Sequence, residues 1–144
     1  DSIYNTEPVF NLHETMVYSD VGIIILGKIV ETISKVKLDV FVQSNIFDPL
    51  GMNNTFYNPP KEKLHRIVPT EIDPKGKLIK GYVHDENAYS ISGVAGHAGL
   101  FSKTKDLAIF SQMMLNKGLY GWKRIFRSET VDLFTQRSNI IQGE

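Results

Sequence analysis

Residues 18–26 read YSDVGIIIL, so a phenol, a hydroxyl and a carboxylate stand directly before an apolar run. Ser19 is a residue type that caps helix N-termini well, and the carboxylate of Asp20 suits the positive end of the helix dipole. Apolar residues then recur almost all round the first two helical turns, while Lys28 and Glu31 keep a narrow polar stripe. The stretch therefore predicts a helix that starts after Ser19 and is buried at the centre of its domain.

Two further features follow this helix. A second helix is predicted over residues 38–46, and Pro49 and Gly51 should stop it, because proline cannot donate a hydrogen bond and glycine permits a left-handed turn. Residues 67–72 and 78–83 have the pattern of two short strands joined by a Pro- and Gly-containing turn, which predicts a hairpin.

Residues 84–99 are rich in Gly, Ser and Ala and predict a close-packed loop with short helical turns, whereas residues 1–17 predict a polar loop. Thr104 should cap a third helix that ends at Gly118, and Ser128 should cap a fourth. The residues expected to face inward on these two helices are Leu107, Phe110, Met113, Met114, Val131 and Phe134. The sequence thus predicts a mainly α chain with a small β-hairpin, forming a single partial domain over residues 1–144.

Composition excludes several classes of protein. The formal net charge is zero and no basic stripe is present, which argues against a nucleic-acid partner. The longest strictly apolar run, residues 23–26, is far shorter than a membrane span requires. The histidines, His13, His65, His84 and His97, lack the spacing of a helical zinc site, so we expect neither a metal nor a cofactor.

Several motifs occur in one order along the chain. They are Tyr18-Ser19-Asp20, the glycine-containing pattern of Gly22, Leu26, Gly27 and Val30, the segment 47–52 followed by Thr55, and the segment 96–102 followed by Asp106, Leu107 and Phe110. Together they resemble the class C β-lactamase-like and DD-peptidase-like serine hydrolases, which have the penicillin-recognising fold. The resemblance covers residues 15–135 and implies the helical part of a β-lactamase/transpeptidase-like α+β fold.

The resemblance implies a mechanism that uses three motifs, of which this chain holds the middle one. Members use a Ser-x-x-Lys nucleophile, a Tyr-x-Asn motif and a Lys/His-Thr/Ser-Gly strand motif, and the serine forms an acyl-enzyme. Carried over, Tyr18 is the general base or proton relay, and Asp20 stands where the family has asparagine. A carboxylate accepts hydrogen bonds but cannot donate them, which puts β-lactam and peptide substrates in doubt and leaves ester substrates open.

Other segments match the missing motifs only in part. Ser34 with Lys37 and Ser102 with Lys105 both have Ser-x-x-Lys spacing, but the first falls at a helix end and the second lies after Tyr18 instead of before it. His97 begins a mimic of the third motif that lacks its hydroxyl, and a packed loop histidine is expected there. The nucleophile and the third motif are therefore expected outside residues 1–144.

These observations favour a fragment of a serine hydrolase that is inactive in isolation. The resemblance implies a small-molecule or peptidoglycan-like substrate and a periplasmic or envelope location, and an exposed apolar face should make the fragment self-associate. Two alternatives remain open at this point: a non-catalytic helical binding module, and an unusual enzyme that uses Ser102 and Lys105.

Overall fold

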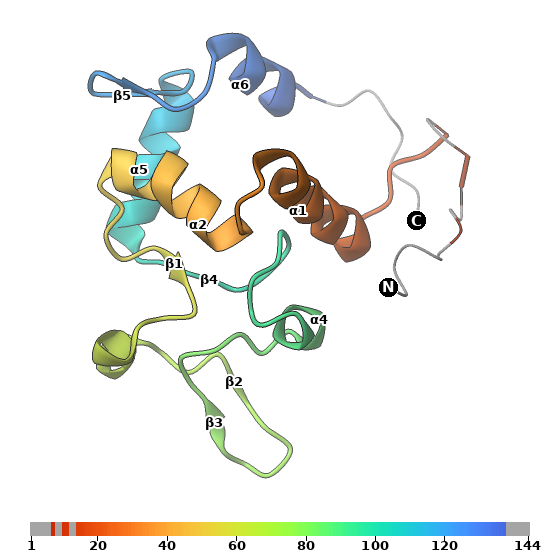
Figure 1. Ribbon diagram of the computed structural model, residues 1–144, viewed down its shortest axis with the longest axis vertical. Helices are drawn as coiled ribbons and strands as arrows, with labels where there is room; N and C mark the ends of the chain where they lie inside the picture. Colours follow the sequence, from red (N-terminus) through yellow and green to blue (C-terminus); the bar gives the residue numbers. More distant parts are fainter. Residues whose placement is uncertain (1–6, 8–9, 12–13, 138–144) are drawn as a thin grey trace.

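The structure is a computed structural model that describes residues 7, 10, 11 and 14–137. Its helices are α1 (Asp20–Ser34), α2 (Leu38–Val42), the π-helix η2 (Gln43–Phe47), α3 (Asp48–Leu50), the 3₁₀-helix η3 (Lys61–Arg66), α4 (Glu86–Ser90), α5 (Thr104–Leu115) and α6 (Ser128–Thr135). Antiparallel pairs join β1 (Phe56–Tyr57) to β4 (Leu100–Phe101), β2 (Glu71–Ile72) to β3 (Leu78–Ile79), and β5 (Leu119–Tyr120) to β6 (Lys123–Arg124). The predicted mainly α chain with a small hairpin is confirmed, with two further short strand pairs (Figure 1).

Helix α1 starts as predicted but is not buried. The Ser19 Oγ accepts a hydrogen bond from the Gly22 N–H at 3.2 Å, which is the expected N-terminal cap. Gly27 is the buried residue of this helix, whereas Leu26 is 55% exposed and Ile33 is 77% exposed. The expectation of a central helix is therefore wrong for the described residues, because α2 and the loop before β4 cover one side of α1 and leave its other apolar side chains in solvent.

Helical structure continues past the predicted end of the second helix, through α2, η2 and α3. A proline ring in an α-helix clashes with the carbonyl four residues earlier, which here belongs to Asn45. The turn before Pro49 is widened into a π-helix, in which the Asp48 N–H bonds the Gln43 carbonyl five residues back. Pro49 thus reshapes the helix and does not stop it, whereas Gly51, at φ 70°, ends the helical segment as predicted.

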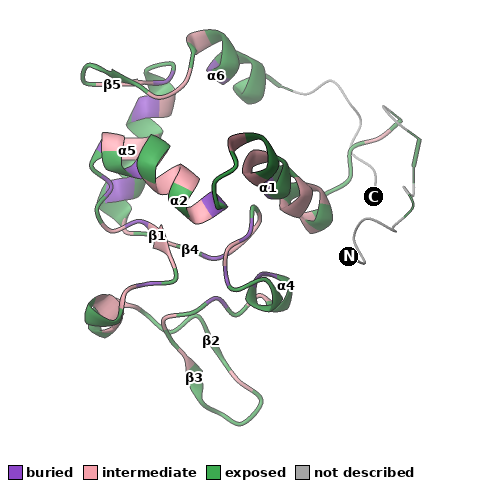
Figure 2. Cartoon of the chain, viewed as in Figure 1, coloured by how far each residue is buried: buried purple, intermediate pink, exposed green. Residues whose placement is uncertain are grey.

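The main apolar cluster lies between this helical segment and α5. Its buried members are Phe47, Leu50, Met52 and Met113. Met113 is fully buried, and Phe110 and Met114 pack against the cluster, so these three inward-facing predictions are confirmed. Buried stretches accordingly appear on α5 in Figure 2, which shows the β2–β3 hairpin as almost entirely exposed.

Two details of α5 and α6 differ from the expectations. Val131 is buried as predicted, but Leu107 is 54% exposed and Phe134 is 81% exposed, because these two side chains lie on helix faces that no described element covers. Thr104 and Ser128 are the first residues of their helices and make no capping hydrogen bond. The N-cap positions belong to Lys103 and Arg127.

The hairpin has the predicted turn. The Asp73 carboxylate accepts hydrogen bonds from the N–H groups of Lys75 and Lys77 at 2.9 and 2.8 Å, and Gly76 has φ 79°. The strands pair over two residues each, which is shorter than the predicted ranges. The hairpin projects from the lower end of the chain in Figure 1, where few neighbours extend its pairing.

The loop before β4 approaches α1 so closely that only glycine fits. A Cβ on Gly96 would lie 2.3 Å from the Ile23 carbonyl oxygen, and a Cβ on Gly27 would lie 3.3 Å from the Gly96 nitrogen. Because the Ile23 carbonyl oxygen belongs to the backbone of α1, it cannot rotate away from a Cβ on Gly96. We therefore expect Gly96→Ala to lower the free energy of unfolding by about 1–3 kcal/mol, measured by urea denaturation.

A matched control for this prediction is Gly22→Ala, where a Cβ meets nothing closer than 3.7 Å. Alanine forms helix better than glycine by about 0.5–1 kcal/mol, so this variant should be neutral or more stable. Equal stability of the Gly96 variant and the parent chain would show that the loop does not pack as described.

Candidate functional site

Tyr18 lies at the N-terminal end of α1, beside an open pocket of about 360 Å³. Its side chain is 85% exposed. The pocket brings Tyr18 and Asp20 together with residues that are distant in sequence and that come from three loops and β4. These residues are Thr70, Val83, His84, Asp85, His97, Ala98, Gly99, Leu100 and Phe101. The two predicted site residues therefore share one pocket.

The electrostatics around Tyr18 keep its proton in place. A hydrogen bond to Asp20 and the negative charges of Asp20 and Asp85 raise the pKa of Tyr18 above its ordinary value. No lysine or arginine is among the described residues that line the pocket. Since a phenol acts as a base only when its pKa is lowered, Tyr18 needs a cation from elsewhere before it can accept a proton at neutral pH.

This arrangement predicts that Asp20→Asn lowers the pKa of Tyr18, because the substitution removes the nearest negative charge and weakens the hydrogen bond that favours the neutral phenol. Tyrosinate absorbance can be titrated with and without the additional change Tyr18→Phe, which isolates this residue. The control is Asp39→Asn, because the pKa of Tyr57 is raised by burial and, to a smaller extent, by the negative charge of Asp39, which does not act on Tyr18. An unchanged or higher pKa of Tyr18 in the Asp20 variant would contradict the geometry.

His97 is held in the same pocket by Asp85. The His97 side chain is 4% exposed, which confirms the predicted packed histidine, and its Nε2 lies 2.9 Å from the Asp85 Oδ1. An ionised carboxylate only accepts, so the ring nitrogen donates. Within the described part of the chain, the buried Nδ1 of His97 has no hydrogen-bond partner.

Asp85 is also the N-cap of α4, because its Oδ1 accepts a hydrogen bond from the Ala88 N–H at 2.7 Å. That backbone hydrogen bond, with the contribution of His97, holds the pKa of Asp85 below its ordinary value against the opposing effect of burial. The sequence gives no sign that Asp85 and His97 are in contact, because they are 12 positions apart, one at the start of α4 and the other in the loop that follows it.

The two Ser-x-x-Lys matches do not form nucleophile sites. The Ser34 Oγ accepts from the Val36 N–H at 3.2 Å at the end of α1. The Ser102 Oγ lies 2.8 Å from the Thr55 Oγ1, while Thr55 donates its single hydroxyl proton to the buried Asp106 at 3.1 Å. Ser102 must therefore donate to Thr55.

In neither match does a described hydrogen bond join the serine to the lysine. Lys105 is exposed, and Lys37 instead lies 3.9 Å from a carboxylate oxygen of Glu31. The alternative of an enzyme that uses Ser102 and Lys105 thus finds no supporting contact in the described residues.

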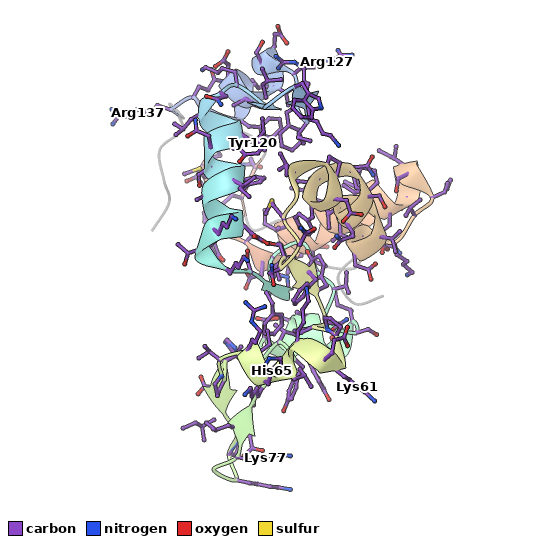
Figure 3. All side chains as sticks on the ribbon, turned by 90° about the vertical axis from the view of Figure 1, so that its left-hand side faces the viewer. Lys61, His65, Lys77, Tyr120, Arg127 and Arg137 are labelled. Carbon is purple, nitrogen blue, oxygen red and sulfur yellow. The ribbon has the colours of Figure 1, made fainter. Side chains whose placement is uncertain are left out.

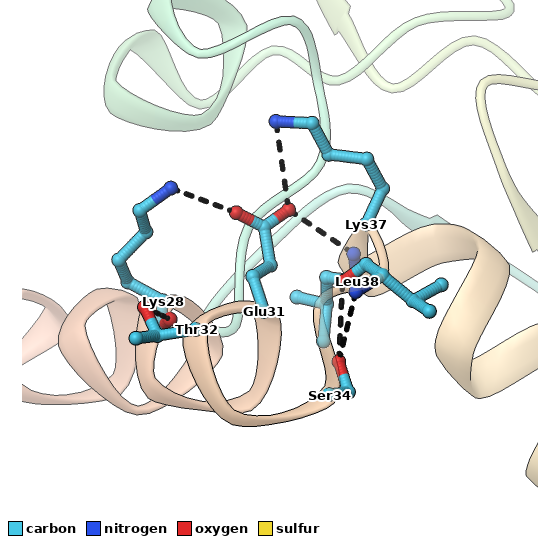
Figure 4. Close-up of polar contacts among 7 residues, drawn as sticks. Lys28, Glu31, Thr32, Ser34, Lys37 and Leu38 are labelled. Atoms are coloured by element: carbon cyan, nitrogen blue, oxygen red, sulfur yellow. Dashed lines mark hydrogen bonds and ion pairs between the residues drawn. The ribbon is translucent and has the colours of Figure 1, made fainter.

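A larger cavity, of about 600 Å³, lies between α1, the start of α2 and residues 91–96. Glu31 stands at its edge and accepts hydrogen bonds from the Lys28 Nζ at 3.0 Å and from the Leu38 N–H at 3.1 Å (Figure 4). Burial raises the pKa of Glu31, but these bonds outweigh it and hold the pKa below its ordinary value. These hydrogen bonds link α1 to the start of α2, so the role of Glu31 is structural.

The described residues contain no group of three or more potential metal ligands, and no described helix is both long and apolar enough to cross a membrane. His13 and most of residues 1–13 lie outside the described residues, so the expectation of a loop there is tested only in part.

Comparisons with known proteins agree on one family. A family model described as Beta-lactamase matches residues 1–138. A protein of Salmonella heidelberg (strain SL476), provisionally named D-alanyl-D-alanine carboxypeptidase, is 42% identical over 137 aligned residues, which cover 85% of this chain and 32% of that relative. The chain therefore spans about a third of the length of the relatives it matches.

Solved structures give the same fold. The octameric penicillin-binding protein homologue from Pyrococcus abyssi is 25% identical with a TM-score of 0.56, covering 80% of this chain and 24% of its own. The beta-lactamase/D-alanine carboxypeptidase from Pseudomonas syringae is 21% identical with a TM-score of 0.62, covering 82% and 30%. With the Tyr18 motif at the start of α1, these matches show that the chain belongs to the Beta-lactamase family and forms the helical part of its α+β fold.

Proposed function

We propose that residues 1–144 are one partial domain of a longer serine hydrolase, in which Tyr18 is the general base or proton relay and Asp20 occupies the asparagine position of the motif. The observation that carries the proposal is the shared pocket of Tyr18 and Asp20 at the start of α1. It is supported by the family match over residues 1–138 and by relatives named as D-alanyl-D-alanine carboxypeptidases.

In the proposed chemistry Tyr18 and Asp20 act together with a serine and a lysine that lie outside this chain. A serine outside this chain attacks the substrate carbonyl while backbone N–H groups hold the oxyanion, and the bond to the amine or alcohol breaks, so that this group leaves with the serine's proton. Water then hydrolyses the acyl-serine ester, which releases the acid and restores the serine hydroxyl. A lysine brought close to Tyr18 would offset Asp20 and Asp85 and lower the pKa of the phenol. Asp20 would accept a hydrogen bond from that lysine, because a carboxylate has no proton to give.

The proposed substrate is a peptide or ester related to peptidoglycan. The relatives' name points to a D-alanyl-D-alanine terminus, and such a substrate would put the protein in the periplasm or cell envelope. Cell fractionation of the source organism tests the location, and recovery in the cytosol alone would count against it.

We expect residues 1–144 to be inactive on their own, because a catalytic unit that lacks its nucleophile retains little beyond binding. The test is the intact mass of this chain and of the complete reading frame after incubation with a reactive penicillin and, separately, a fluorophosphonate. The proposal expects a single adduct on an upstream serine of the complete protein and none on the isolated chain. An adduct on Ser102 of the isolated chain, or none on either protein, would overturn it.

A non-catalytic binding module is the second candidate, and the apolar surface left in solvent on α1 favours it. Val21, Ile23, Leu26, Ile29 and Ile33 are each at least 37% exposed. A complete reading frame with no Ser-x-x-Lys segment upstream of Tyr18 would support this candidate over the hydrolase.

The same exposed side chains lead to a prediction about association. Apolar patches of this kind bind one another in water, so the isolated chain should form dimers or larger species at micromolar concentration. Sedimentation velocity measures this directly, and Ile29→Lys with Ile33→Lys on α1 should restore the monomer. A monomer at all concentrations, without binding of an apolar dye, would contradict the prediction.

A further inference from the structure

A small pocket between η3, β4 and the start of α5 gathers three cations. Its volume is about 70 Å³, and Lys63, Arg66 and Lys103 line it together with Asn54 and Ser102. Lys63 and Arg66 come from η3, and Lys103 precedes α5 almost 40 positions later in the chain. The fold therefore brings together positive charges that the sequence keeps apart.

Two of these cations are held in place by neutral groups. The Lys63 Nζ donates to the Asn53 carbonyl at 2.7 Å and lies 4.7 Å from the centre of the Phe56 ring. One guanidinium nitrogen of Arg66 donates to the Asn54 Oδ1 at 3.3 Å. An ammonium carries three donor hydrogens and a guanidinium five, so both side chains keep N–H groups for another acceptor.

No carboxylate lines the pocket, and none of the ion pairs among the described residues includes Lys63, Arg66 or Lys103. The acidic group linked to this region is Asp106, which is 2% exposed and accepts from the Asn54 N–H at 2.7 Å and from Thr55. It lowers the local charge by one and leaves the pocket positive. Ser102 gives its proton to Thr55, so the cations supply the donors that a ligand would meet.

We propose that this pocket binds one small oxyanion, namely a phosphate or carboxylate group of a ligand. A volume of about 70 Å³ leaves room for one such group beside the three cations. Arginine and lysine around a shared point form charge-assisted hydrogen bonds with either oxyanion. Phe101 lines both this pocket and the Tyr18 pocket, so an anion bound here lies next to the proposed hydrolase site without depending on it.

The test compares three forms of the chain in the same buffer at constant ionic strength, each with Ile29→Lys and Ile33→Lys so that the chain is monomeric. They are the parent chain, the double variant Arg66→Gln with Lys103→Gln, and the control Lys61→Gln with Lys77→Gln. The control removes the same charge from exposed positions on η3 and at the hairpin tip, and Figure 3 shows both lysines. Amide NMR spectra are recorded while inorganic phosphate and, separately, acetate are added in place of chloride.

The proposal expects saturable shifts at residues 61–67 and 101–104 in the parent and the control, and affinity about tenfold weaker for each cation removed in the double variant. The charge-retaining variant Arg66→Lys should bind the anion with an affinity within a few fold of the parent. It shows that the weaker binding of the double variant comes from the lost charge and not from a change in folding. Saturation by phosphate alone identifies a phosphate ligand, and saturation by both anions identifies a carboxylate as well. Shifts that do not saturate, or equal affinities in parent and double variant, would overturn the proposal.

Discussion

Replacing Tyr18 with Phe in the complete protein is expected to lower kcat/KM about 10²–10⁴-fold, with most of the loss in kcat. The proposed proton relay depends on a hydroxyl that phenylalanine lacks, while the ring that contacts the pocket is preserved. The measurement is the steady-state release of D-alanine from a D-alanyl-D-alanine peptide, or of alcohol from an ester, by the parent and the variant.

The matched control for this substitution is Tyr89→Phe. Tyr89 is 63% exposed, its ring lies against Tyr82, and it does not line the Tyr18 pocket, so its rate should stay within a few fold of the parent. A Tyr18 variant that is as active as the Tyr89 variant would remove Tyr18 from the chemistry. It would leave the family membership of the chain untouched.

Replacing Asp106 with Ala is expected to lower the free energy of unfolding by about 2–4 kcal/mol. Asp106 is 2% exposed, and its carboxylate accepts from the Asn54 N–H at 2.7 Å and from the Thr55 hydroxyl at 3.1 Å. Alanine would leave the part-buried Asn54 N–H without its acceptor and the buried Thr55 hydroxyl with Ser102 as its remaining partner, and it would weaken the contact between α5 and the strand pair β1–β4. Urea denaturation followed by far-ultraviolet circular dichroism measures the loss.

Two further substitutions separate the buried network from charge alone. Asp106→Asn keeps an acceptor oxygen and should therefore lower the free energy of unfolding by less than Asp106→Ala does. Asp132→Ala removes a carboxylate that is 55% exposed and pairs with Lys117 at the surface, which should cost about 1 kcal/mol or less. Equal losses for Asp106→Ala and Asp132→Ala would show that the Asp106 hydrogen bonds do not stabilise the fold.

Local chemistry alone determined several elements. The Ser19 cap, the left-handed end at Gly51 and the turn at residues 73–76 each depend on atoms within a few positions of one another. Such short-range hydrogen bonds and backbone preferences are properties of the residue types themselves. The order of motifs along the chain likewise indicates the family that the match over residues 1–138 shows.

Local residue preferences were less reliable for the exact positions at which helices begin and end. Thr104 and Ser128 are residue types that cap helices well, yet each is the first residue of its helix. The N-cap positions are therefore Lys103 and Arg127. Pro49 reads as a helix breaker, but a widened π turn absorbs its ring. Tertiary packing on the apolar cluster decides these cases, because it holds the backbone helical where local preference alone would end it.

Amino-acid sequence alone determined the start of α1, the turn of the β2–β3 hairpin, the family and the Tyr18–Asp20 motif, because each depends on residues that are close together or on motifs that follow one another in a recognisable order. Only the tertiary structure decided which faces are buried and which side chains meet. The exposure of α1, the contact of Asp85 with His97 and the grouping of Lys63, Arg66 and Lys103 are examples. The physical reason is that burial and electrostatics depend on distance in space, and the loops that set those distances carry no periodic signal.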